Sequence, residues 1–252
     1  MYKIPANTLF MGKNLVYVPE CHSTNRLASE LCQLTSTVEG TIVITDNQIK
    51  GHGQRGNSWL SDPHKNLTFS LVVRPSFLKP IDQFYLTIAI SLALRDFLTH
   101  RINGAINIKW PNDILINEKK VCGILIENML SGDSIEYSVV GIGLNVNQDS
   151  FLFVTATSMK AIARHDFNLP DEWSLLCEFL ERRYLQLRSG KIVELKNDYL
   201  SCLYGKGKHR RFIDATGEMQ GVIEGIDQQG KLLIDTQAGI KAYDLKEIRF
   251  IG

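Results

Sequence analysis

The chain has 252 residues, with 28 Lys and Arg against 27 Asp and Glu, and therefore a formal net charge of +1. This length allows one large domain with a small one, and it suffices for a hydrophobic core without disulfides. The near-neutral charge argues against bulk electrostatic binding to nucleic acid or anionic membranes, although it leaves room for a local anion site. A composition of 44% hydrophobic and 22% charged residues excludes a disordered chain.

Signals for export or membrane insertion are missing from the sequence. No run approaches the ~18 consecutive apolar residues of a transmembrane helix. Pro5, Gly12 and Pro19 interrupt the N-terminal segment, so we do not expect a signal peptide. The five cysteines are scattered and form no CxxC pair, which favours reduced thiols. We therefore expect a cytoplasmic protein.

Hydrophobic periodicity predicts a chain that mixes helices and strands. Helical spacing from Leu27 to Leu34 indicates a first helix capped by Ser23 or Thr24, and the longest apolar helical pattern indicates a central buried helix. In chain order, the expected elements are a helix over 24–34, strands over 41–45 and 66–75, a helix over 81–99, strands and turns over 105–147, and helices around 158–164, 171–188 and 191–203.

The residue pattern changes again after the predicted helices. Gly205 and Gly207 break the pattern, and the remaining residues contain five short strand-like runs separated by glycine-containing turns. Short strands at such spacing predict a small β-barrel. We therefore place a domain boundary near residue 205, which gives a first domain over 1–204 and a second over 205–252.

A glycine-rich loop follows the strand pattern at 41–45. Residues 51–56 read GHGQRG, which fits G-x-G-x-x-G, but the next segment contains Pro63 and leads into another strand. A dinucleotide site needs a helix there, so we do not expect a Rossmann fold. The glycines would let the backbone approach a ligand, Arg55 suits a phosphate or carboxylate, and Trp59 could stack on a base. The alternative is a surface loop with an incidental Arg and Trp.

Polar residues also gather at the turn KWPND, residues 109–113. Lys109 could neutralise a phosphate, and Asn112 with Asp113 could orient a substrate or hold magnesium. Ordinary turn chemistry after a proline is the alternative. Lys120 opens the next buried strand, either as a snorkelling strand end or as a cation delivered to a site.

Other polar groups carry two interpretations each. Two glycines in the strand pattern at 141–147 suggest the close approach of a backbone or ligand, with Asn145 beside them. Ser23-Thr24-Asn25 could cap a helix or bind a ligand. The basic run from Lys206 to Arg211 forms either a solvated face or a supporting contact to nucleotide phosphates.

Two other kinds of site are not expected. Cys21-His22 lacks the supporting acid of a thiol nucleophile, and the six histidines lack the spacing of a zinc site.

Taken in order, these motifs resemble the biotin protein ligases of the bacterial type. The resemblance runs from about residue 18 to 148, and a short β-barrel tail completes that family's outline. The motifs are Ser-Thr-Asn at 23–25, Gln48, the glycine loop with Trp59, Asn66-Leu67, Lys-Trp-Pro-Asn-Asp at 109–113, Lys-x-x-Gly-Ile-Leu at 120–125 and Gly-Ile-Gly-x-Asn-Val at 141–146.

The resemblance implies a fold and a reaction. The fold is α+β, a mixed sheet with helices of the class II synthetase-like biotin–lipoate ligase type, followed by a small SH3-like C-terminal β-barrel. The reaction is that of a biotin–[acetyl-CoA-carboxylase] ligase. Biotin and ATP, brought with magnesium, give biotinyl-5′-adenylate, and a lysine of a biotin carboxyl carrier protein then displaces AMP. Lipoate ligases and octanoyl transferases share the fold, so a lipoate or octanoate enzyme is one alternative; a non-catalytic biotin-binding sensor is another.

The resemblance also implies a role for each motif residue. Lys120, Arg55 and Lys109 would be catalytic, with no fixed metal site beyond Asp113 as a ligand of ATP-borne magnesium. The biotin-binding residues would be Ser23, Thr24, Asn25, Gln48, Gly51, His52, Gly53, Gln54, Lys120 and Gly123. The nucleotide-binding residues would be Arg55, Trp59, Asn112, Asp113 and Asn145.

The glycine loop departs from the family pattern, which most often reads Gly-Arg-Gly-Arg-x-Gly-Arg. Here His52, Gln54 and Asn57 stand at the three arginine positions. In the family, the arginine at the position of Gln54 helps to retain the reactive adenylate, so we expect a weaker hold on the intermediate. His22 replaces a common aspartate and receives no role.

Some relatives carry an N-terminal helix-turn-helix and repress biotin synthesis. The motifs here begin at Ser23, and ~20 residues are too few for a three-helix DNA reader. We therefore expect ligase function without DNA or membrane binding. Dimers are common in the family, but the sequence shows no decisive edge-strand signature and does not identify the carrier.

Overall fold

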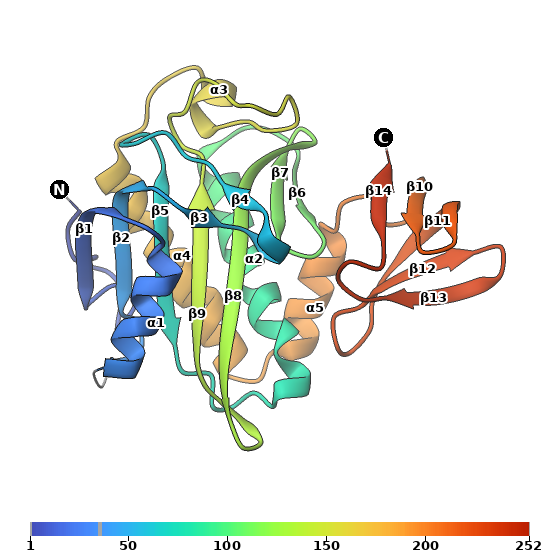
Figure 1. Cartoon of the computed structure of the whole chain (residues 1–252), viewed down its shortest axis with the longest axis horizontal. Helices are drawn as coiled ribbons and strands as arrows, with labels where there is room; N and C mark the ends of the chain where they lie inside the picture. The colour runs from blue at the N-terminus through green and yellow to red at the C-terminus, as the bar shows by residue number, and fades with distance from the viewer. Residues whose placement is uncertain (1, 35–36, 252) are drawn as a thin grey trace.

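The computed structural model describes residues 2–34 and 37–251, except for the side chain of Arg55. A seven-stranded sheet and a five-stranded sheet lie side by side, joined by a helical segment (Figure 1). The helices are α1 (Thr24–Leu34), α2 (Phe84–Arg101), α3 (Met159–Ala163), α4 (Leu169–Arg188) and α5 (Ile192–Ser201), with short 3₁₀ turns η1 (Gln54–Gly56) and η2 (Pro80–Asp82).

The larger sheet is mixed. Its strands are β1 (Leu15–Cys21), β2 (Ile42–Gln48), β5 (Leu67–Val73), β6 (Ile106–Lys109), β7 (Asp113–Ile116), β8 (Lys119–Ser131) and β9 (Ser134–Leu144), in the order β1-β2-β5-β9-β8-β7-β6. β1 and β2 are parallel because α1 crosses between them, and all the other neighbours are antiparallel. This confirms the expected α+β class.

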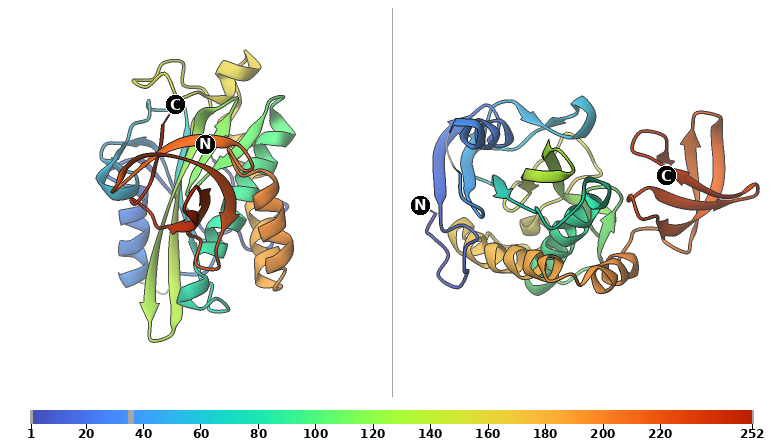
Figure 2. Two further views of the ribbon diagram at one scale, coloured as in Figure 1. Left: turned by 90° about the vertical axis from the view of Figure 1, so that its right-hand side faces the viewer. Right: turned by 90° about the horizontal axis from the view of Figure 1, so that it is seen from below.

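Helices cover both faces of this sheet, but unequally. α1 packs on one face, where Ala28 meets Val43, Val72 and Val139. α2, α4 and α5 pack on the other face and bury the main core, as the view from below shows (Figure 2). β5 lies between these layers, so all seven of its residues are buried. The part of the α1 face that α1 leaves uncovered, over β8 and β9, is available for a site.

The helices lie close to their expected positions. α1 spans the predicted residues, and α2 is the buried central helix, although it starts at Phe84 because residues 80–82 form η2. The Asn168 side chain caps α4 by accepting a hydrogen bond from the Asp171 N–H. Among the described helices, none is both long and apolar enough to cross a membrane.

The C-terminal residues form the five expected strands, but they do not close into a barrel. The strands are β10 (His209–Asp214), β11 (Gly217–Ile226), β12 (Leu232–Thr236), β13 (Gly239–Tyr243) and β14 (Arg249–Ile251), in the order β13-β12-β11-β10-β14. β13 and β14 are the two edges and are not paired within the described strands, so the small SH3-like barrel expected from the sequence is open between these two strands. The curled antiparallel sheet is consistent with an SH3-like unit.

Specific contacts fix the two sheets against each other. The Trp110 Nε1 donates a hydrogen bond to the Gly230 carbonyl oxygen over 2.8 Å. Gly230 lies directly against the ring of Phe84, and a Cβ at this position would overlap that ring. The C-terminal sheet is thereby held beside the end of the larger sheet that carries β6 and β7, and its loops can contribute to a site there.

Candidate functional site

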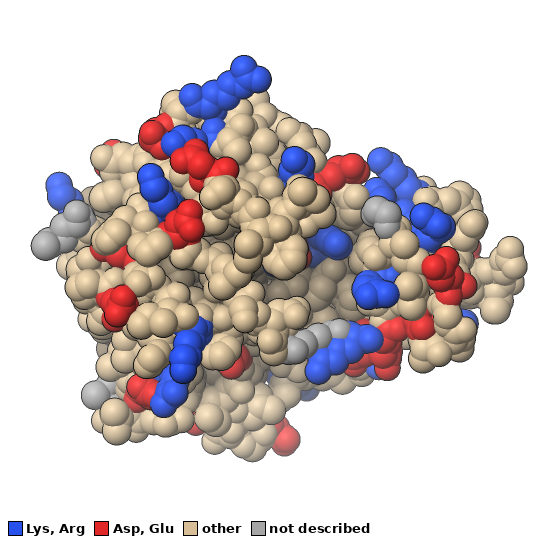
Figure 3. Space-filling model, turned by 45° about the horizontal axis from the view of Figure 1, so that its top comes forward, with Lys and Arg blue, Asp and Glu red and all other residues tan. Residues whose placement is uncertain are grey.

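A pocket of about 310 Å³ opens on the α1 face of the larger sheet, under the glycine-rich loop. We call it the central pocket. Residues from both halves of the sequence line it, and Figure 3 shows the hollow between the two parts of the molecule. The lining residues are Ser23, Thr24, Asn25, Gln48, His52, Gly53, Gln54, Asn57, Ser58, Trp59, Thr68, Lys109, Trp110, Pro111, Asn112, Asp113, Lys120, Gly123, Ile124, Leu125, Gly141, Ile142, Gly143, Lys246, Ile248, Arg249 and Phe250.

Glycines of two neighbouring strands form the floor of the central pocket. Gly123 of β8 and Gly143 of β9 are directly paired, and the Trp59 indole lies against both. A Cβ on Gly143 would overlap this indole. The sequence predicted that a backbone or a ligand approaches the glycines of β9, whereas the structure places side chains there: the Trp59 ring lies against Gly143, and the Asn25 amide lies against Gly141.

The glycine-rich loop is a hairpin laid over the pocket. β3 (Gly51–His52) pairs with β4 (Ser58–Trp59), and η1 forms the tip. No helix follows β4 before the next strand, which confirms that the loop is not a dinucleotide-binding turn. Gly51 must remain small because it contacts the backbone of Trp59. The loop backbone thus closes one side of the pocket, while His52 and Gln54 line it.

One end of the central pocket is neutral and highly ordered. Gln48 Oε1 accepts a hydrogen bond from the backbone N–H of Thr24 over 2.9 Å, and the hydroxyl oxygens of Ser70 and Thr24 lie 2.8 Å apart. The Ser23 side chain accepts from the Arg26 N–H, so its capping role coexists with its position in the lining. These hydroxyl and amide groups form a preorganised donor and acceptor array.

Asn25 differs from its neighbours because its amide is engaged within the protein. Its Oδ1 accepts from the Ser70 hydroxyl over 2.6 Å, and its Nδ2 donates to Glu127 Oε2 over 2.7 Å. Gly141 provides the space for this amide, since a Cβ there would overlap Asn25 Oδ1. The geometry therefore gives Asn25 a positioning role: it fixes the start of α1 on the sheet and so orients Thr24.

The opposite end of the pocket is cationic. Lys120 Nζ lies 2.6 Å from Asp113 Oδ1 and 5.5 Å from the centre of the Trp59 ring. Lys109 Nζ lies 5.1 Å from the centre of the Phe250 ring. Burial lowers the pKa of Lys109; the charges of Lys120 and Arg210 act in the same direction, and Asp113 opposes them. The KWPND turn and the strand beginning with Lys119-Lys120 are thus brought together at one anion-binding end.

The C-terminal sheet adds two cations that the sequence did not point to. Lys246 and Arg249, together with Ile248 and Phe250, line the central pocket. The sequence left two interpretations open for the run from Lys206 to Arg211, a solvated face or a supporting phosphate contact, and none of these residues lines the pocket. Arg210 instead stacks on Tyr204 and lies 3.8 Å from Glu118. Asp113 is the one described carboxylate in the lining, which leaves the pocket net positive.

An apolar hollow of about 900 Å³ adjoins the central pocket on the far side of Trp59. Leu60, Phe151, Leu152 and Phe153 line it, and Asn145 lies at its base. Asn145 Nδ2 donates to the Thr157 carbonyl oxygen, but its Oδ1 is buried without a partner, as is Trp59 Nε1. Asn145 therefore lies in this neighbouring hollow and offers an acceptor to a ligand placed against Trp59.

Three sequence candidates remain, namely Arg55, Cys21 and His22. The side chain of Arg55 lies outside the described part of the chain, so its role remains a prediction. Cys21 is partly buried, and this burial raises the pKa of its thiol, which disfavours a nucleophilic thiolate. His22 is exposed, and no group of three or more His, Cys, Asp or Glu side chains suited to a metal occurs among the described residues.

Comparison with known proteins places this geometry in a family. Residues 17–145 match the model of the biotin/lipoate A/B protein ligase family. The chain is 34% identical to the bifunctional ligase/repressor BirA of Bacillus subtilis, over 93% of this chain and 73% of that protein. It is 30% identical to the biotin–[acetyl-CoA-carboxylase] ligase of Paracoccus denitrificans, over 91% and 98% respectively.

Solved structures agree with the sequence comparison. The biotin protein ligase of Aquifex aeolicus in complex with biotin and ATP has a TM-score of 0.79 at 27% identity, and the match covers 95% of this chain and 99% of that one. The family match covers the glycine-rich loop, the KWPND turn and Lys120, whose side chains or backbone form the central pocket. This chain therefore belongs to the biotin/lipoate A/B protein ligase family.

Proposed function

We propose that this chain is an ATP-dependent biotin–protein ligase that acts through biotinyl-5′-adenylate on a lysine of a biotin carboxyl carrier protein. The central pocket supports this proposal because it joins a neutral hydrogen-bonding end to a cationic end. Biotin has the same division, with a neutral ureido head and a carboxylate tail. Relatives that match almost the whole chain bear the name of this enzyme.

The neutral end would receive the ureido group. Thr24 and Gln48 are already held in place by mutual hydrogen bonds, so binding requires little loss of side-chain freedom. Their polar atoms match a head group that both donates and accepts hydrogen bonds. Because the Trp59 indole covers Gly123 and Gly143, the ring system would pack against this indole rather than against the backbone of β8 and β9.

The cationic end would reduce the charge repulsion in the first step of the reaction. A carboxylate that attacks the α-phosphate of ATP must approach an anion, and preplaced cations reduce this repulsion. Lys120 would contact the biotin carboxylate and the developing adenylate, and Lys109 would support the phosphates. Lys246 and Arg249 reach the same end from the C-terminal sheet. The phosphorus–oxygen bond to pyrophosphate breaks as the bond to the biotin carboxylate oxygen forms.

The nucleotide would extend from this end into the apolar hollow. Trp59 borders both spaces and could stack on adenine, while the unpartnered Asn145 Oδ1 could accept a hydrogen bond from the adenine amino group. Asn112 and Asp113 offer one amide and one carboxylate. Such a small donor set suits magnesium that arrives on ATP phosphates and supplies charge neutralisation there.

In the second step, the lysine amine of the carrier attacks the acyl carbon of the adenylate. The new carbon–nitrogen bond forms, the acyl carbon–oxygen bond breaks, and AMP leaves with its phosphate oxygen while the amine loses its proton. Lys120, close to this acyl centre, would stabilise the charge that moves onto the leaving phosphate. The free state of all five cysteines supports a reducing, cytoplasmic setting for the reaction.

A direct test uses the full chain with ATP, magnesium and a purified biotin carboxyl carrier domain. We expect the mass of the carrier to increase by one biotinyl group, only when both ATP and biotin are present. Replacing biotin by lipoate or octanoate should give no product, because a plain acyl chain leaves the array around Thr24 and Gln48 unpaired. Binding of biotin without any transfer would instead support a sensor and contradict the proposal.

A further inference from the structure

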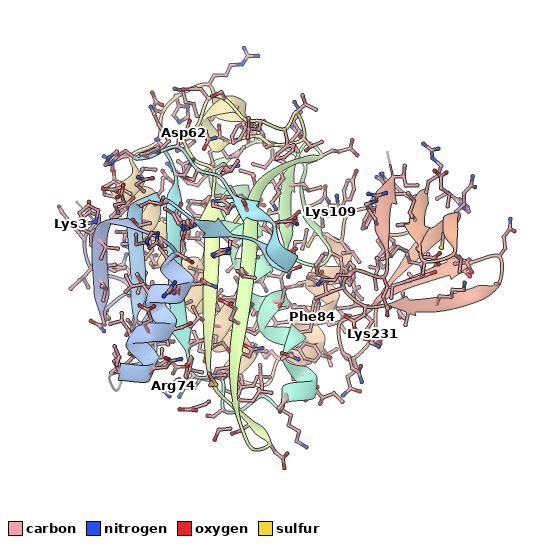
Figure 4. All side chains as sticks on the ribbon, viewed as in Figure 1. Lys3, Asp62, Arg74, Phe84, Lys109 and Lys231 are labelled. Carbon is pink, nitrogen blue, oxygen red and sulfur yellow. The ribbon has the colours of Figure 1, made fainter. Side chains whose placement is uncertain are left out.

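A second hollow lies between the two sheets, beside the central pocket. It is a groove of about 450 Å³, which we call the inter-sheet groove. One wall comes from β8 and the start of α2, including Ile126 and Phe84, and the other comes from C-terminal loops, including Lys231 and Leu245. Figure 4 shows Phe84 and Lys231 on facing sides of the space between the sheets.

The inter-sheet groove adjoins the central pocket. Gln54, Pro111, Asn112 and Ile124 line both. The apolar hollow joins the central pocket through a different set of shared residues, which includes Trp59 and Lys120. The central pocket therefore has two side branches, and the proposed function fills only one of them with nucleotide.

The second substrate of the reaction still requires a route. Its amine must reach the acyl centre near Lys120 while biotin fills the neutral end and the nucleotide fills the hollow. We propose that the inter-sheet groove admits the target lysine of the carrier, and that the groove walls bind the carrier segment next to this lysine. This inference rests on the proposed function and deepens it by naming the site of the protein substrate.

The lining of the groove has the chemistry that a lysine side chain needs. Ile126, Phe84 and the partly exposed Leu245 provide apolar surface for the methylene stem. Asp244 lies at the outer end, where its side chain is 55% exposed and lies 4.0 Å from Lys231, so its carboxylate can guide an incoming ammonium group. The inner end opens at Asn112, next to the charged pair of Asp113 and Lys120.

Two loop substitutions test this proposal without touching the proposed chemistry. Leu245→Ala shortens the apolar wall, and Asp244→Asn removes the guiding charge. We expect the double variant to raise the KM for the carrier domain about tenfold, since loss of two interface contacts is commonly worth that much. Ile240→Ala and Asp235→Asn form the matched control, because both residues are exposed on the same sheet and outside the groove.

Assays of adenylate formation alone distinguish an effect on carrier binding from an effect on the chemistry. Biotin-dependent exchange of pyrophosphate into ATP, and trapping of the adenylate with hydroxylamine, should proceed at the wild-type rate in the double variant. A wild-type KM for the carrier would overturn the proposal. A raised KM for ATP or pyrophosphate with an unchanged KM for the carrier would also overturn it, because the groove would then serve the nucleotide. If the proposed function itself failed, the wild-type protein would form no hydroxamate.

Discussion

The two ends of the central pocket are built in opposite ways. At the neutral end, Thr24 and Asn25 are buried, and both side chains are hydrogen-bonded to the Ser70 hydroxyl. At the cationic end, Lys120 is 36% exposed and Asp113 is 24% exposed, with a single short ion pair between them. One end is rigid and complete before the ligand arrives, and the other is open and carries excess positive charge.

This contrast corresponds to the two kinds of binding that the reaction requires. A neutral head group gains little from long-range attraction, so its site depends on fixed donors and acceptors at correct distances. A triphosphate is attracted from a distance by the summed charge of the site, which does not need a buried network in advance. Specificity for biotin should therefore reside at the neutral end, and rate enhancement at the cationic end.

The largest expected effect comes from removing charge at the cationic end. Lys120→Ala should lower the rate of adenylate formation by about 10²–10³-fold, since it removes a preplaced stabilising charge from the site of reaction. Biotin-dependent pyrophosphate exchange measures this rate. Lys119→Ala is the matched control, because Lys119 is exposed and outside the pocket lining. A Lys120→Ala enzyme that exchanges pyrophosphate within a few-fold of wild type would remove the proposed role.

The neutral end should respond in affinity rather than in rate. Gly141→Ala places a methyl group on the Asn25 amide oxygen, and we expect biotin affinity to fall about tenfold with a loss of roughly 1–3 kcal/mol in the free energy of unfolding. Calorimetric titration with biotin and thermal unfolding measure the two effects. Adding Asn25→Ala should recover part of the lost stability, because the overlap is then removed. No recovery in the double variant would show that the damage lies elsewhere.

Structure that depends on neighbouring residues was predictable from the sequence, whereas contacts between distant residues were not. Local signals predicted α1 and the strands within 105–147, since each of these elements depends on neighbouring residues. The hydrogen bonds that engage the Asn25 amide within the protein were not predictable from the sequence. Its partners, Ser70 and Glu127, lie 45 and 102 residues away along the chain.

The C-terminal sheet shows the limit most clearly. Its five strands were expected, but closure depends on whether β13 and β14 meet, and the observed order leaves them as opposite edges. Which basic residues face the pocket likewise depends on how this sheet packs against the larger one. Lys246 and Arg249 reach the pocket, whereas the denser basic run at 206–211 does not line it.

A third prediction concerns pH at the cationic end. Burial, chiefly, lowers the pKa of Lys109, so its charge is lost at a lower pH than that of a surface lysine. We expect the KM for ATP to rise severalfold as pH increases through this lowered value, and Lys109→Arg to flatten the rise because a guanidinium stays charged. Pyrophosphate exchange across the alkaline range measures both. A wild-type KM that does not change with pH would contradict the role of Lys109.

The same shift predicts a change in stability with the opposite sense. Between the lowered pKa and the usual value near 10.5, the unfolded chain binds the proton that the folded chain has lost. Lys109 should therefore raise the free energy of unfolding as pH rises through this window, and it should contribute no pH dependence below it. Urea unfolding of wild type and Lys109→Met at several alkaline pH values isolates this contribution. Parallel curves for the two proteins would contradict it.

The smallest expected effect lies in the loop between the two ends. Gln54 lines the central pocket at the position where related ligases most often carry an arginine, and its amide can form only neutral hydrogen bonds with an adenylate. Gln54→Arg should slow release of biotinyl-5′-adenylate about fivefold, because charge-assisted hydrogen bonds are roughly twice as strong as neutral ones. Rapid dilution followed by trapping with hydroxylamine measures the release rate. Gln237→Arg, at an exposed residue outside the pocket lining, makes the same substitution elsewhere and controls for added charge alone. If the wild-type protein already retains the adenylate as long as its Gln54→Arg variant does, neutral hydrogen bonds suffice, and the loop arginine serves another purpose in the relatives that have it.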